Sequence, residues 1–152
     1  MVDVDTGCFT VAVFQDVEWA RKGLSALKGA GFHAESLTIL ARDGQGVAAL
    51  IEEMLGSSAA TLELATVGPV LAKGPLIQAL QGSGGDLVKS GIAATMRKVG
   101  FQPHDGRIYD TLTGRGGVLV AIQSDPRAAD ALAILHSYGG GNAAIGAWSG
   151  RV

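Results

Sequence analysis

The residues most capable of chemistry in this chain include an arginine flanked by glycines. The segment 113–117 reads Thr-Gly-Arg-Gly-Gly, and an arginine next to free glycine amides can hold an anion. We therefore identify Arg115, Gly116 and Gly117 as possible contacts for an anion or another ligand. The alternative is a turn between a helix and a strand, in which the glycines permit a bulge or a close backbone approach.

The histidines and the only cysteine lack the spacing of a metal site. None of His33, His104 and His136 lies three or four residues from another histidine or from Cys8, as the local ligand pairs of zinc sites do. We predict no bound metal. An enzyme would have to assemble its site from scattered residues, for example around His33, His104 and Arg115. Cys8 precedes an apolar run, where a cysteine is typically a small apolar side chain in the core.

A glycine-rich segment at 82–90 invites comparison with a phosphate-binding loop. Its sequence, GSGGDLVKS, has Val88 where a Walker loop needs glycine before the Lys-Ser pair. We interpret it as the start of a helix. The neighbouring carboxylates Glu52 and Glu53 point in different directions on a helix, so they form a poor acid–base pair. The sequence therefore predicts no catalytic residue and no cofactor.

The length and composition limit the classes of protein to which the chain can belong. With 152 residues, 47% of them hydrophobic, and a net charge of −2, the chain can bury the core of a single domain spanning 1–152. The near-neutral charge gives no sign of nucleic-acid binding. No stretch of about 20 uncharged apolar residues predicts a transmembrane helix, and the N-terminus lacks an apolar signal sequence. Together with the single cysteine, these features lead us to expect a cytoplasmic protein.

A strand–helix–strand pattern occurs twice, at 8–42 and at 116–148, and predicts the elements that must position these residues. The predicted strands are 9–14, 36–42, 118–122 and 143–148, and the first helix is 17–30. Two such units predict an α+β fold with a ferredoxin-like antiparallel sheet. The corresponding apolar positions of the two helices are Ala20, Leu24 and Leu27 in the first, and Ala128, Leu132 and Leu135 in the second.

The segment between the two units, 43–114, predicts a helical insertion rich in glycine and proline. Apolar spacing predicts helices at 47–55 and 86–99, and another helix begins at Pro103. The Gly-Pro pairs at 68–69 and 74–75 predict helix starts or tight apolar turns, because proline fits the first position of a helix.

Several segments resemble the bacterial general stress protein domain of the heat-induced YflT type, also described as general stress protein M-like. They are VAVF, LTILARD, GPVLAKGPLIQAL and RGGVLVAIQSD, and the resemblance extends along nearly the whole chain. It implies a small, stress-associated cytoplasmic α+β protein, from a family without established catalytic residues.

Both alternating sets of positions in the runs 9–14 and 118–122 are apolar, so both faces of the sheet must be covered. The helices of the two units can cover one face. Either the insertion or a second subunit covers the other. We favour a homodimer with Leu119 or Val120 at the contact, to which the insertion also contributes. Trp19, beside the apolar stripe of its helix, is a further candidate interface residue.

Three functions are compatible with these observations. The leading hypothesis is a non-enzymatic, stress-associated protein that acts through oligomeric protein–protein interaction. The first alternative is a small-ligand or regulatory binding module with a pocket between the sheet and the insertion. The second alternative is an enzyme whose site the sequence does not reveal.

Overall fold

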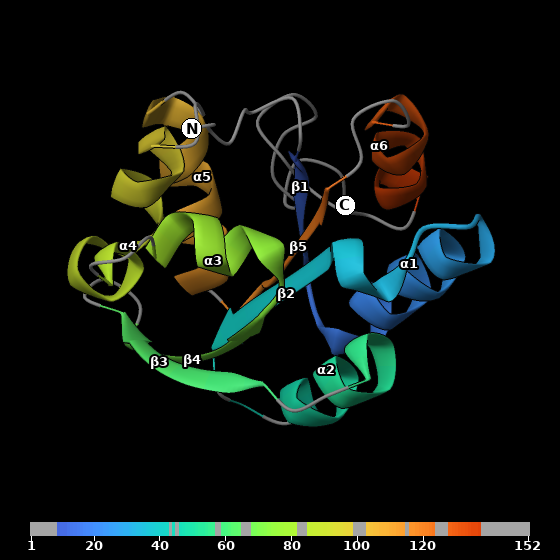
Figure 1. Cartoon of the computed structure of the whole chain (residues 1–152), viewed down its shortest axis with the longest axis horizontal. Coiled ribbons are helices and arrows are strands. Elements are labelled where there is room, and N and C mark those ends of the chain that lie inside the picture. The colour runs from blue at the N-terminus through green and yellow to red at the C-terminus, as the bar shows by residue number, and fades with distance from the viewer. Residues whose placement is uncertain are drawn as a thin grey trace.

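One antiparallel sheet forms the centre of the molecule (Figure 1). The computed structural model describes residues 9–42, 44, 46–56, 59–64, 68–81, 85–98, 103–114, 116–123 and 128–137. In chain order the elements are β1 (Phe9–Phe14), α1 (Val17–Gly29), the short 3-10 helix η2 (Ala34–Ser36), β2 (Leu37–Arg42), α2 (Val47–Leu55), β3 (Ala60–Leu64), β4 (Gly68–Lys73), α3 (Pro75–Gln81), α4 (Asp86–Lys98), α5 (Pro103–Gly114), β5 (Val118–Gln123) and α6 (Ala128–Ser137).

The sheet confirms an α+β fold, but its strand order is not that of a ferredoxin-like fold. The order is β1-β5-β2-β4-β3, and all neighbouring strands are antiparallel. Because β5 pairs with both β1 and β2, those two strands run parallel to each other and α1 connects them. The expected last strand, 143–148, lies outside the described residues.

The prediction of a purely helical insertion is wrong. Part of that segment forms the hairpin β3–β4, which extends the sheet beyond β2. The run GPVLAK, expected as a helix start or turn, is strand β4. Pro69 lies near the start of β4, opposite Glu63 of β3 and beyond the end of the ladder with β2, so its missing amide removes no bond to β2.

The first helix follows its local sequence signals. The Asp16 carboxylate accepts a hydrogen bond from the Trp19 amide at 2.9 Å and caps α1. Gly31 lies just beyond the helix with φ of 99°, a conformation that favours glycine at a helix end. The apolar stripe of α1 is fully buried and consists of Ala20, Leu24 and Leu27.

Helices cover both faces of the sheet, so the expectation that neither face is exposed is confirmed. One cluster of buried residues joins a sheet face to α1, α2 and α6. The other joins the opposite face to α3, α4 and α5, and Figure 1 shows the two groups of helices on opposite sides of the sheet. The insertion therefore covers the face for which a second subunit was favoured.

This arrangement corrects two of the proposed interface residues. Leu119 is 1% exposed and packs in the cluster beneath α3, α4 and α5. Val120 is 0% exposed and packs in the cluster on the other face. Both side chains belong to the core of one chain, so they offer no surface to a second subunit.

Among the described residues, no helix combines the length and the apolar composition needed to cross a membrane.

Candidate functional site

A cleft of about 650 Å³ opens where the ends of β1 and β2 meet the starts of α1, α2 and β5. Because β1 and β2 run parallel, their carboxyl ends lie at the same edge of the sheet, where ligands commonly bind in α/β proteins. We call this the arginine cleft. Its lining includes Val17, Arg21, Arg42, Gly46, Val47 and Gly116.

Arg42 supplies a positive charge that no described side chain neutralises. It is the last residue of β2 and is exposed. One guanidinium nitrogen, Nη1, donates to the carbonyl oxygen of Gly114 at 3.0 Å, which ties the end of β2 to the end of α5. In the described part of the chain Arg42 makes no ion pair. A guanidinium held at one nitrogen keeps further donors for a carboxylate or a phosphate.

Arg21 has a different role in the wall of the cleft. Its Nε donates to Glu53 of α2 at 3.1 Å, and its Nη1 donates to Glu18 of α1 at 3.0 Å. The side chain therefore bridges the two helices that border the cleft. These ion pairs are partly exposed, so each adds only a small amount of stability, and Arg21 is already paired.

The start of α2 also favours an anion. Gly46 occupies the N-cap with φ of 85°, and no described side chain caps the helix. The Val47 amide donates to the Gly44 carbonyl at 3.3 Å, so the free amides are those that follow it in the first turn. The first turn of α2 contains no acidic residue. Uncapped amides and the positive end of the helix dipole both attract negative charge. The carboxylate of Asp16 also lines the cleft, where it accepts a hydrogen bond from the Trp19 amide and caps α1.

The structure brings one of the three proposed anion contacts to this cleft. Gly116 lines it, with φ of 99°. Its amide, however, donates to the Thr113 carbonyl, and the Gly117 amide donates to the Leu112 carbonyl, each at 3.0 Å. These two amides close the end of α5, so Gly116 provides space in the cleft and no free donor. Arg115 lies outside the described residues.

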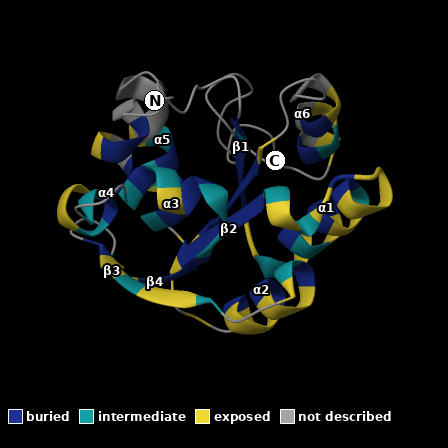
Figure 2. Cartoon of the chain, in the orientation of Figure 1, coloured by how far each residue is buried: buried dark blue, intermediate teal, exposed yellow. Residues whose placement is uncertain are grey.

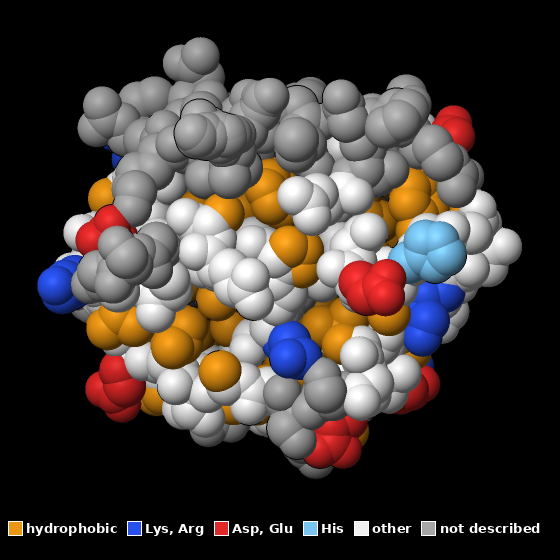
Figure 3. Space-filling view, viewed as in Figure 1, with side chains coloured by type: hydrophobic (Ala, Val, Ile, Leu, Met, Phe, Trp, Pro, Cys, Tyr) orange, Lys and Arg blue, Asp and Glu red, His pale blue; other side chains and the backbone are white. Residues whose placement is uncertain are grey.

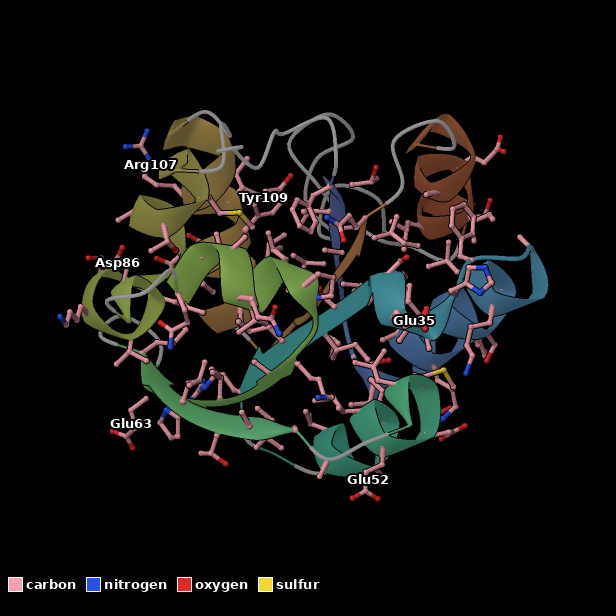
Figure 4. All side chains as sticks on the ribbon, viewed as in Figure 1. Glu35, Glu52, Glu63, Asp86, Arg107 and Tyr109 are labelled. Carbon is pink, nitrogen blue, oxygen red and sulfur yellow. The ribbon has the colours of Figure 1, made fainter. Side chains whose placement is uncertain are left out.

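His33 lies at the other end of β2, in a second cleft of about 580 Å³. Glu35, Lys73 and Gln78 share its lining with His33, and Figure 4 labels Glu35. The His104 side chain is outside the described part of the structure, as is Arg115, so the hypothetical grouping of these residues with His33 is not placed. Within the described residues, no group of three His, Cys, Asp or Glu side chains could hold a metal ion.

Trp19 remains accessible on the surface of α1. It is 41% exposed, and the Lys22 ammonium nitrogen lies 4.6 Å from the centre of its ring. This position leaves it available as an interface residue.

Figure 3 shows isolated charged groups among apolar side chains on the face it displays, without a broad patch of one charge sign.

Sequence reasoning predicted the helix at 47–55 but did not identify Arg42 or the start of this helix as parts of a binding site. The available signal was positional, because Arg42 ends an apolar strand and Gly46 precedes a helix that lacks a capping side chain. Recognising the site also required knowing that β1 and β2 run parallel, which depends on β5 lying between them.

Comparison with models of known protein families, with curated proteins and with solved structures finds no match for this chain.

Proposed function

We propose that the protein is a non-catalytic module that binds a small anionic ligand, carrying a phosphate or a carboxylate group, in the arginine cleft. The observation that carries this proposal is the Arg42 guanidinium, which shares the cleft with the uncapped start of α2. An arginine that donates a charge-assisted hydrogen bond and the free amides at a helix start both bind phosphate or carboxylate groups.

The size and walls of the cleft suit such a ligand. Its volume of about 650 Å³ lies within the range of about 300–1,000 Å³ typical of small-molecule sites. Val17, Val47 and Val118 supply apolar contacts, while Glu18 is engaged by Arg21. An anionic group would therefore bind near Arg42, with the rest of the molecule against the valines.

Thermal unfolding in the presence of inorganic phosphate, small sugar phosphates and dicarboxylates tests the proposal. We expect a rise in Tm that grows with ligand concentration, since a ligand that binds only the folded state stabilises it. Calorimetric titration should then show an affinity lower by about tenfold to a hundredfold for Arg42→Gln, because a charged hydrogen bond contributes roughly 1.5–3 kcal/mol.

The matched control is Lys89→Gln, which removes one positive charge from an exposed position on α4. We expect it to leave the affinity unchanged, because α4 lies on the opposite side of the sheet. Equal losses in the two variants would show a general charge effect. A chain that none of these compounds stabilises would contradict the proposal.

A second proposal retains the leading hypothesis from the sequence, a cytoplasmic, stress-associated protein that acts as a homo-oligomer. The resemblance of its segments to the general stress protein domain supports it, and so does the exposed Trp19, since aromatic residues are enriched at interfaces. The amount of protein in its cells before and after heat shock, together with light scattering of the purified chain, tests both parts. An unchanged amount and a monomeric chain would contradict them.

A further inference from the structure

Strand β3 forms an open edge of the sheet. It pairs with β4 on one side only. In the described part of the chain, Ala60–Leu64 makes no backbone hydrogen bond beyond that ladder. Figure 2 shows much of β3 exposed, in contrast to the buried β2. An edge of this kind presents unpaired backbone donors and acceptors to another strand.

The side chains of β3 leave this edge accessible. Leu62 and Leu64 pack in the cluster with α4, whereas Thr61 and Glu63 alternate with them and are exposed. Figure 4 shows Glu63 pointing away from the sheet. The strand contains neither proline nor lysine, the residues that most often block an edge.

We propose that β3 pairs with β3 of a second copy of this chain, antiparallel and about a two-fold axis at Leu62. The sheets of the two subunits would then form one continuous sheet. This inference rests on the second proposal above, the homo-oligomer, and identifies its contact surface. It is independent of the arginine cleft.

The negative charge of Glu63 selects this register. An axis at Leu62 pairs all of Ala60–Leu64, and it places Thr61 opposite the partner's Glu63. A hydroxyl can donate to a carboxylate in each of these two symmetric pairs. An axis at Glu63 would instead place two carboxylates directly opposite each other, which is destabilising. An axis at Thr61 would leave Leu64 without a strand residue opposite it.

Opposite charges introduced at Thr61 test both the partner and the register. Thr61 is exposed, so both variants should fold. In Thr61→Lys each new ammonium faces the partner's Glu63, and we expect dimerisation to tighten about fivefold. In Thr61→Glu the like charges should weaken it by a similar factor. Sedimentation equilibrium measures the dissociation constants, and circular dichroism checks the fold.

A second substitution provides the control. Adding Glu63→Lys to Thr61→Glu restores opposite charges across the axis, and we expect the dimer to recover. Equal effects of lysine and glutamate at Thr61 would overturn the β3 contact while leaving a homo-oligomer through another surface. A wild-type chain that remains monomeric at its highest soluble concentration would contradict both the contact and the homo-oligomer. Arg42→Gln should not change the dissociation constant.

Discussion

The two faces of the sheet are both buried, but they are covered in different ways. On the face with α1, α2 and α6, α1 carries its own start and stop signals, Asp16 and Gly31. On the other face, α3 begins with a hydrogen bond to a distant strand and α4 contains a kink. The Leu76 amide at the start of α3 donates to Thr38 Oγ1 of β2 at 3.0 Å, and α4 is kinked at Gly91, where φ is 88°. Local signals nevertheless predict helices in both layers, since the helices expected at 86–99 and from Pro103 are α4 and α5.

The largest expected loss of stability follows substitution of Gly74, which lies between β4 and α3. Its φ is 130°, and a Cβ atom there would lie 2.5 Å from the Leu37 carbonyl oxygen of β2. Backbone atoms cannot move aside cheaply, so Gly74→Ala should destabilise the fold by about 4 kcal/mol or prevent folding. Urea unfolding of the purified variant measures this loss.

Gly68→Ala is the matched control, because Gly68 also has positive φ, 92°, but a Cβ atom there would contact nothing within 4 Å. We expect a loss of only about 1 kcal/mol from the backbone conformation. Equal losses at the two glycines would show that the close approach to β2 contributes nothing.

The next effect concerns the hydrogen bond between the sheet and α3. Thr38 is fully buried, and its hydroxyl accepts from the Leu76 amide. Thr38→Val keeps the shape but leaves that amide unpaired, which costs about 1–3 kcal/mol. Urea unfolding should show this loss, with hydrogen exchange of the α3 amides faster than in the wild type. A variant as stable as the wild type would contradict this role of Thr38.

A smaller effect tests the packing of the first layer. A Cβ atom at Gly23 of α1 would lie 2.6 Å from Cζ of Phe14, so Gly23→Ala forces the ring to move. Overpacking costs about 1–3 kcal/mol, and the higher helix propensity of alanine offsets about 1 kcal/mol of it. We expect a net loss of about 1 kcal/mol in thermal unfolding.

Gly29→Ala in the same helix is the control, because a Cβ atom there has no neighbour within 4 Å. It should raise stability by up to about 1 kcal/mol. If Gly23→Ala were also stabilising, the contact with Phe14 would not limit the packing of α1.

Elements with a clear apolar spacing could be predicted from the sequence in both layers, whereas the strand order could not. The strands at 9–14 and 118–122 and the helix at 47–55 depend on apolar spacing, and the structure places β1, β5 and α2 there. Strand β3 was missed because its apolar side chains, Leu62 and Leu64, form too short an alternation to distinguish from a loop. The arginine cleft depends on the strand order, which no local pattern contains.

The smallest expected effect distinguishes two buried threonines. Thr113 of α5 is as buried as Thr38, but its hydroxyl has no hydrogen-bond partner in the described part of the chain. A buried hydroxyl without a partner has lost its bonds to water. Thr113→Val removes that group at nearly constant volume, so stability should stay the same or rise by up to about 1 kcal/mol. Urea unfolding of the two valine variants side by side should show a clear loss for Thr38→Val alone. A comparable loss for Thr113→Val would mean that this hydroxyl stabilises the end of α5, beside the Gly114 carbonyl that holds Arg42.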